Sequence, residues 1–143
     1  MAGKSTYLAR AILNHVFRTT SYSKPSNVYI SLHSADPTDA NTTATELTIG
    51  TGGYARATVA VADAQWTAPA SSGTDELITN ANTISFGTAS ATWNSGNPIT
   101  HFGIYDASTS GNLMYSGALG TSRTVLSGDP VSVAAGALSI REY

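Results

Sequence analysis

The three histidines, His15, His33 and His101, are the side chains of this sequence best suited to acid–base chemistry or metal binding near neutral pH. No two of them are three to five residues apart and no HExxH motif occurs, so their spacing does not form a zinc site. A GxSxG nucleophile elbow and a Walker loop are also absent. We therefore expect a protein that is not an enzyme, with no catalytic residues, no metal site and no cofactor.

The carboxylates offer one further candidate for chemistry, the acidic stretch that runs from Asp36 to Asn41. Oxygen side chains at alternating positions bind Ca²⁺, but the EF-hand pattern fails because Thr38 stands at its third position and its glycine and final glutamate are missing. A turn built on Asp36-Pro37 is the favoured interpretation. The other acids lie mostly in turn contexts, which is a poor arrangement for glycoside hydrolysis.

Three aromatic residues, Tyr54, Trp66 and Trp93, have the type needed to stack against sugar rings. If they lie together on the surface, the chain is a carbohydrate- or receptor-binding module. The alternative is that they belong to a β-sandwich core or to a subunit contact. The sequence leaves both interpretations open.

Composition narrows the classes of partner. Lys and Arg number 7 and Asp and Glu number 9, only 11% of the chain is charged, and no basic cluster is present that would bind nucleic acid. No apolar run approaches the length of a membrane span, and no convincing signal peptide begins the chain. Ser and Thr fill 38 positions, and an uncharged surface packs against other proteins at little desolvation cost. We expect protein partners, neither nucleic acid nor membrane, and folding in the cytoplasm.

The first segment predicts one helix. Ser5 or Thr6 can cap it, and Leu8, Ile12 and Val16 recur at helical spacing before a polar stretch and Pro25 end it. This apolar stripe has two possible roles. It packs on the core of its own domain, or it forms an arm that docks on another subunit.

After residue 25 the hydrophobic period changes to two, which predicts short strands separated by turns. The expected strands cover 28–33, 54–62, 77–79, 82–86, 99–106, 113–116, 123–126, 131–133 and 137–140, and a loop of about twenty residues fills 34–53. The count and spacing favour a mainly β fold, an antiparallel β-sandwich or jelly-roll-like domain preceded by one N-terminal α-helix. We expect a single domain over 1–143, with helix and linker in 1–24 and the sandwich in 25–143.

Two positions within these strands have specific expected contacts. Arg56 faces away from the alanine-rich side of its strand, which makes it a candidate for a bidentate contact to a neighbour's carboxylate. Gly103 lies inside a strand, where glycine is costly unless another group packs close to it. We expect Trp93 to be that group.

An ordered set of motifs over nearly the whole chain resembles the tail-fibre-like family of small tailed-phage virion proteins. The segments that carry the resemblance are Leu13-Asn14-His15-Val16-Phe17-Arg18, Val28-Tyr29-Ile30-Ser31-Leu32, Asp36-Pro37-Thr38-Asp39, Gly52-Gly53-Tyr54-Ala55-Arg56, Ile84-Ser85-Phe86, Trp93, Thr100-His101-Phe102-Gly103-Ile104-Tyr105-Asp106-Ala107, Gly111-Asn112-Leu113-Met114-Tyr115-Ser116-Gly117 and Val133-Ala134-Ala135-Gly136-Ala137-Leu138. The resemblance implies a structural role in a virion and no enzyme activity.

Together these observations predict an external structural component of a tailed-phage virion, either a capsid decoration or cement protein or a fibre-like protein of the tail or neck. We expect it on the virion surface as a homo-oligomer bound to other capsid or tail proteins. The alternative is the carbohydrate- or receptor-binding β-sandwich module. The candidate interface residues are Leu8, Ile12, Val16, Tyr54, Arg56, Trp66 and Trp93.

Overall fold

The computed structural model describes residues 3–42 and 44–143. One α-helix and ten strands make up its regular structure, with two short 3-10 turns between them. In chain order the elements are β1 (Gly3–Lys4), α1 (Thr6–Phe17), β2 (Asn27–His33), η1 (Thr51–Gly53), β3 (Ala57–Ala60), β4 (Ala70–Ser72), β5 (Asp75–Thr79), β6 (Ile84–Thr88), η2 (Trp93–Gly96), β7 (Ile99–Tyr105), β8 (Leu113–Arg123), β9 (Pro130–Val133) and β10 (Ser139–Glu142).

The largest sheet has five strands in the order β1-β8-β7-β2-β3, and every neighbouring pair is antiparallel. Strand β2 lies between β7 and β3, with Ile30 opposite Ile104 and Leu32 opposite Phe102. Side chains directly opposite each other share a face of the sheet. The alternating apolar residues of these strands therefore form one continuous inner face.

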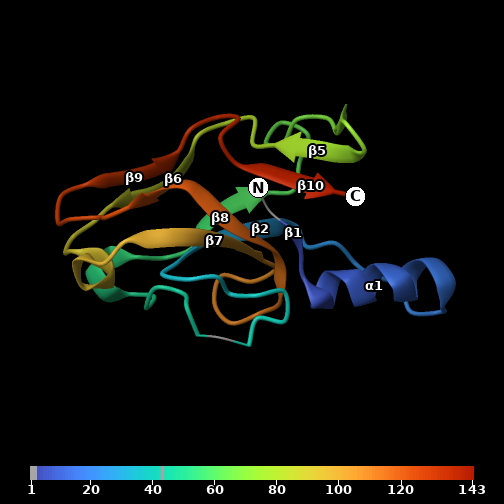
Figure 1. The fold of residues 1–143 in the computed structure, drawn as a ribbon, viewed down its shortest axis with the longest axis horizontal. Coiled ribbons are helices and arrows are strands. Elements are labelled where there is room, and N and C mark those ends of the chain that lie inside the picture. The colour runs from blue at the N-terminus through green and yellow to red at the C-terminus, as the bar shows by residue number, and fades with distance from the viewer. Residues whose placement is uncertain (1–2, 43) are drawn as a thin grey trace.

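Two smaller sheets, β10-β5-β4 and β6-β9, cover that inner face, and they form the upper layer in Figure 1. Ile84, Leu138 and Ile140 from these sheets are buried in the same cluster as the inner face of the main sheet. A second buried cluster surrounds Trp93 and includes Val125. The prediction of a mainly β fold with antiparallel sheets and one helix near the N-terminus is confirmed, and the arrangement is sandwich-like; the jelly-roll topology stays a prediction.

Strand β8 differs most from the sequence prediction. It runs from Leu113 to Arg123 and so includes the start of the strand expected at 123–126. Val125 is buried in the second cluster, and its carbonyl accepts a hydrogen bond from the backbone N–H of Trp93 at 3.0 Å. Because η2 holds this segment, β9 pairs with β6 and not with 123–126. The short strands β1 and β4 were not predicted.

The outer face of the main sheet is also covered, although alternation in β2 predicts a half-buried strand. Ser31 and His33 point to this face, and their exposed fractions are only 0% and 1%. The segment 34–53, drawn in cyan beneath the sheet in Figure 1, lies over them. Two backbone contacts anchor this segment to β2. The Leu47 N–H donates to the Leu32 carbonyl at 3.0 Å, and Glu46 forms an isolated antiparallel β-bridge with His33.

Gly103 packs against this covered outer face. A Cβ atom built there would lie 2.7 Å from Ser31 Oγ, 3.0 Å from His33 Nε2 and 3.0 Å from a Leu113 methyl group. The prediction that Trp93 packs against Gly103 is wrong. The Trp93 ring packs instead against Gly52, and its Nε1–H donates to the Gly52 carbonyl at 2.8 Å. The requirement for a glycine is as expected, but a different set of side chains causes it.

Replacing Gly103 with alanine should lower the free energy of unfolding by about 1 to 3 kcal/mol, because the methyl group overlaps buried groups that have no room to move. Gly120→Ala is the matched control. It lies on β8 with no atom within 4 Å of its Cβ position, so alanine should be neutral or slightly stabilising there. Urea unfolding measures both variants, and equal losses would contradict the packing argument.

Candidate functional site

The structure offers two candidate sites, the helix α1 and the covered outer face of the main sheet. The base of α1 is fixed at Ser5, as its predicted capping role requires. The Ser5 hydroxyl accepts from Leu8 N–H at 3.2 Å and donates to the Leu113 carbonyl, while Ser5 N–H donates to the Met114 carbonyl at 2.8 Å. These bonds join the first turn of the helix to β8. Helix α1 therefore has a rigid origin at the edge of the sheet.

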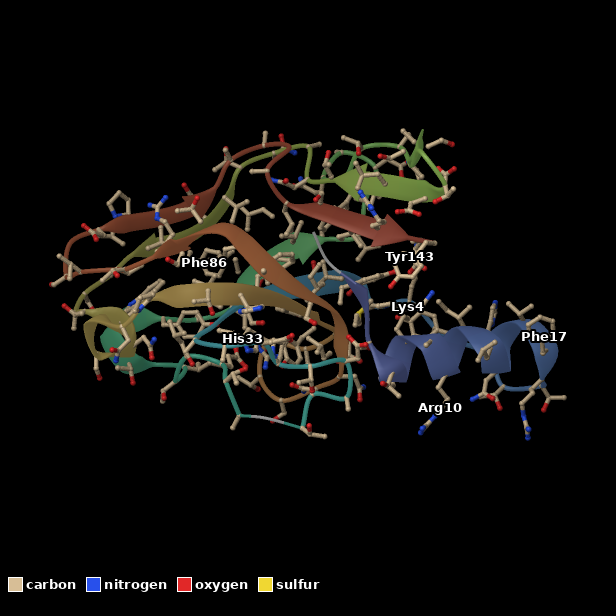
Figure 2. All side chains as sticks on the ribbon, viewed as in Figure 1. Lys4, Arg10, Phe17, His33, Phe86 and Tyr143 are labelled. Carbon is tan, nitrogen blue, oxygen red and sulfur yellow. The ribbon has the colours of Figure 1, made fainter. Side chains whose placement is uncertain are left out.

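Beyond its first turns α1 leaves the body of the molecule and extends to the right in Figure 1. Leu8 is buried and Ile12 packs partly on the core, but Val16 is 59% exposed. Leu13 is 58% exposed, and Phe17, at the far end of the helix in Figure 2, is 78% exposed. The stripe therefore packs on the core only at its beginning, and its end has the form of an arm whose apolar side chains are uncovered. Docking of this end on another subunit stays a prediction.

The chain returns along the helix before it enters β2. Tyr22 N–H donates to His15 Nδ1 at 3.1 Å, and the Tyr22 ring packs partly against the main core. Burial is the first cause that raises the pKa of Tyr22, with the negative charge of Asp106 adding to it. We call α1 and this return segment, residues 6–26, the arm.

On the outer face of the sheet, Arg56 makes the bidentate carboxylate contact that its position predicted, but the carboxylate belongs to the same chain. Arg56 Nε and Nη2 donate to the two oxygens of Glu46 at 2.7 and 2.6 Å. Nη1 donates to the carbonyls of Ala107 and Ser110 at 2.7 and 2.8 Å. The guanidinium thus holds the segment 34–53 and the β7–β8 turn against the end of the sheet.

An aromatic ring completes the environment of this ion pair. The Arg56 guanidinium lies 3.7 Å from the centre of the Tyr105 ring, and Tyr105 Oη donates to Asn41 Oδ1 at 3.1 Å. Burial alone lowers the pKa of Arg56, but hydrogen bonds and charge from Glu46 outweigh it, so the pKa is raised. Arg56 therefore stays charged across the ordinary pH range.

His33 lies beside this ion pair, inside the body of the molecule (Figure 2). Its Nε2 is 2.8 Å from Ser31 Oγ, its Nδ1 is 2.9 Å from Thr45 Oγ1, and its ring stacks on Tyr105 with a centroid distance of 6.3 Å. Burial, together with the nearby charge of Arg56, lowers the pKa of His33 to about 4, although Glu46 opposes the shift. The ring is neutral near pH 7. Both Ser31 and His33 are almost fully buried, at 0% and 1% exposed, and His33 lines a pocket together with Thr45, Glu46 and Tyr105.

The aromatic residues do not form the sugar-stacking platform that the sequence left open. Tyr54 and Trp93 are each 1% exposed and pack edge to face at 5.3 Å in the second buried cluster. Trp66 lies elsewhere, partly buried against the main cluster. Two buried rings and one distant ring cannot present a common surface, so this part of the carbohydrate-binding hypothesis is wrong.

The predicted interface residues therefore occupy three environments. Leu8, Tyr54, Arg56 and Trp93 are buried, Ile12 and Trp66 are partly buried, and Val16 is exposed. An interface role for any of them stays a prediction. The sequence analysis missed Glu46 as the partner of Arg56 and Leu13 and Phe17 as the exposed end of the stripe. The available signal for Glu46 was that it is the one glutamate in a loop that contains no lysine or arginine.

The remaining acidic and histidine candidates form turns or lie on strands of the main sheet. Asp36 forms the expected turn, in which its Oδ1 accepts from Thr38 N–H at 2.8 Å. His33 and His101 are opposite each other on β2 and β7. Within residues 3–42 and 44–143 no group of three His, Cys, Asp or Glu side chains is placed to hold a metal ion. Nor does this part of the chain contain a helix of the length and apolarity needed to cross a membrane.

A match to a family model over nearly the whole chain identifies a small structural protein of the phage tail-fibre-like class. Residues 3–141 match the family model described as podophage GP4 fiber I protein gp80, and the chain belongs to this family. The match covers every strand from β1 to β9 and most of β10. No curated protein matches the chain.

Removing one partner of the buried Arg56–Glu46 ion pair should lower the free energy of unfolding strongly. Arg56→Met leaves the Glu46 carboxylate without its counter-charge in a site where the two side chains are 3% and 19% exposed, and we expect a loss of about 3 to 5 kcal/mol. Lys4→Met, in the more solvent-accessible pair with Glu142, whose side chains are 28% and 39% exposed, should cost less, about 1 kcal/mol. Urea unfolding distinguishes them. A double replacement, Arg56→Met with Glu46→Leu, should recover part of the loss, and no recovery would contradict this account.

Stability should fall in acid because of His33. The unfolded chain takes up a proton near pH 6.5, whereas the folded chain resists it until about pH 4, so unfolding is favoured as pH falls through this window. We expect wild-type protein to lose about 2 to 3 kcal/mol between pH 7 and pH 4 relative to His33→Gln, which retains hydrogen-bonding groups but does not titrate. Urea unfolding at several pH values tests this. An unchanged pH slope in His33→Gln would show that other groups cause the effect.

Proposed function

We propose that this protein is an external, fibre-like component of a tailed-phage virion that acts through assembly with other virion proteins. The single observation that carries the proposal is the family match over residues 3–141. The surface chemistry supports it, because only 11% of the residues are charged and the body therefore docks with little ion desolvation. In this proposal residues 1–143 act as one domain, fold in the host cytoplasm and assemble as a homo-oligomer at the tail or neck.

A position at the tail or neck is favoured over capsid decoration by the shape of the molecule. A decoration protein binds a broad shell through a flat face, whereas this chain has a narrow arm that extends from one end of its body (Figure 1). The family description also names a fibre. If the protein were found on the capsid, the proposed role would change to that of a cement protein.

The cysteine-free sequence allows a direct test of location on the particle. Leu126→Cys places a thiol at a side chain that is 54% exposed, and Ser72→Cys places one on the exposed strand β4. Intact virions that carry either variant should bind maleimide-gold on their outer surface, at the tail or neck, above the level of wild-type particles. Val125→Cys, at a buried neighbour, is the control and should stay at the wild-type level.

Electron microscopy of the labelled particles gives the readout. Gold along the head shell would replace the tail or neck assignment with capsid decoration. No gold at either exposed position, on particles that contain the variant chains by mass spectrometry, would show that the protein is not external.

A further inference from the structure

Charge is divided unevenly between the arm and the body. Four of the 7 Lys and Arg residues precede residue 25, whereas all 9 Asp and Glu residues follow residue 35. The arm carries Arg10, Arg18 and Lys24, and the ion pairs formed within the described ranges involve none of them. A basic arm on an acidic body is complementary to the body of another copy.

The end of the arm also presents apolar surface. Leu13, Val16 and Phe17 are three and four residues apart, so they lie on one side of α1 and form a continuous patch at its tip. Arg18 follows directly, at the C-terminal cap of the helix. The tip therefore combines apolar anchors with a positive charge, and in Figure 2 Phe17 lies at the end farthest from the body.

A groove lies where the return segment of the arm meets the body. Apolar side chains of Val61, Trp66, Pro69 and Ile78 line it, and its two charged lining residues are Asp63 of the body and Lys24 of the return segment. Trp66 Nε1–H donates to the Ala60 carbonyl at 3.1 Å, which satisfies its one polar group and leaves the ring as an apolar wall. The groove accepts an apolar side chain, and Asp63 offers a carboxylate to a neighbouring cation.

We propose that the tip of α1 in one copy of this chain docks in the Val61–Ile78 groove of a second copy, with Phe17 and Leu13 as anchors and Arg18 beside Asp63. The tip cannot reach its own groove, because Ser5 fixes the base of the arm and Tyr22 holds the return segment while the tip extends away from the body. The contact joins two different surfaces, so it is heterologous and propagates until a ring closes or a filament forms. This inference rests on the proposed fibre function and adds the surfaces through which copies join.

Mixing two defective variants tests the two-surface contact directly. Phe17→Ser removes the anchor of the arm, and Ala68→Arg fills the groove at an exposed position that lines it. Each variant alone should be a monomer by light scattering, with self-association weakened about tenfold or more. Mixed together they should form only a one-to-one dimer, because one intact arm and one intact groove remain.

Leu126→Ser is the matched control for Phe17→Ser, since it also replaces an exposed apolar side chain with serine but lies outside both surfaces, and it should assemble like the wild type.

A charge exchange is the second measurement. Arg18→Glu and Asp63→Arg should each weaken assembly, and the double variant should restore it. Near-native far-ultraviolet circular dichroism of each variant shows that a monomer is a folded monomer.

Three results would overturn the inference. They are a wild-type chain that stays monomeric at all concentrations, arm variants that assemble normally, and a mixture of the two defective variants that remains monomeric. None of these results affects the gold-labelling test, so the proposed virion location and the proposed self-assembly contact can each be disproved without the other.

Discussion

The ion pair between Arg56 and Glu46 is the constraint on which the outer face of this protein depends. It joins three parts of the chain, the start of β3, the segment 34–53 and the β7–β8 turn, through four hydrogen bonds from a single side chain. A connecting segment of about twenty residues loses much entropy when it is ordered, and anchors at its far end offset that loss. With this cover in place His33 is neutral and buried, and the backbone at Gly103 has room for no side chain.

Local chemistry made much of the fold predictable. The Ser5 cap, the helix up to the polar stretch before Pro25, and the alternation in β2 and β7 are decided by neighbours in the sequence. Alternation separates the two faces of a strand, but it does not say which faces are covered, so the burial of Tyr54 and Arg56 was not predictable from their own strand. The same limit explains β8, whose length is set by its pairing with β7 over distant residues. The sequence did not decide whether the end of α1 is covered, because an apolar stripe has the same spacing whether it packs on its own chain or on another.

The two candidate sites have opposite relations to solvent. Around Arg56, polar groups are drawn inward and make their hydrogen bonds within the chain. At the end of the arm, apolar groups are turned outward. Exposed phenylalanine and leucine at the tip of a projecting helix form the kind of apolar surface that marks an interaction site. Membership of a phage fibre family implies other virion components as interaction partners.

The position of the arm in the topology has a mechanical consequence. The return segment leads directly into β2, the strand that is hydrogen-bonded to β7 on one side and β3 on the other. A pulling force on the tip therefore enters the sheet along the length of β2, where the hydrogen bonds to the strands on both sides share the load at once. The base at Ser5 is joined to β8 as well, so tension divides between two strands. An attachment made through this arm would therefore resist a pulling force better than one made through a single edge strand.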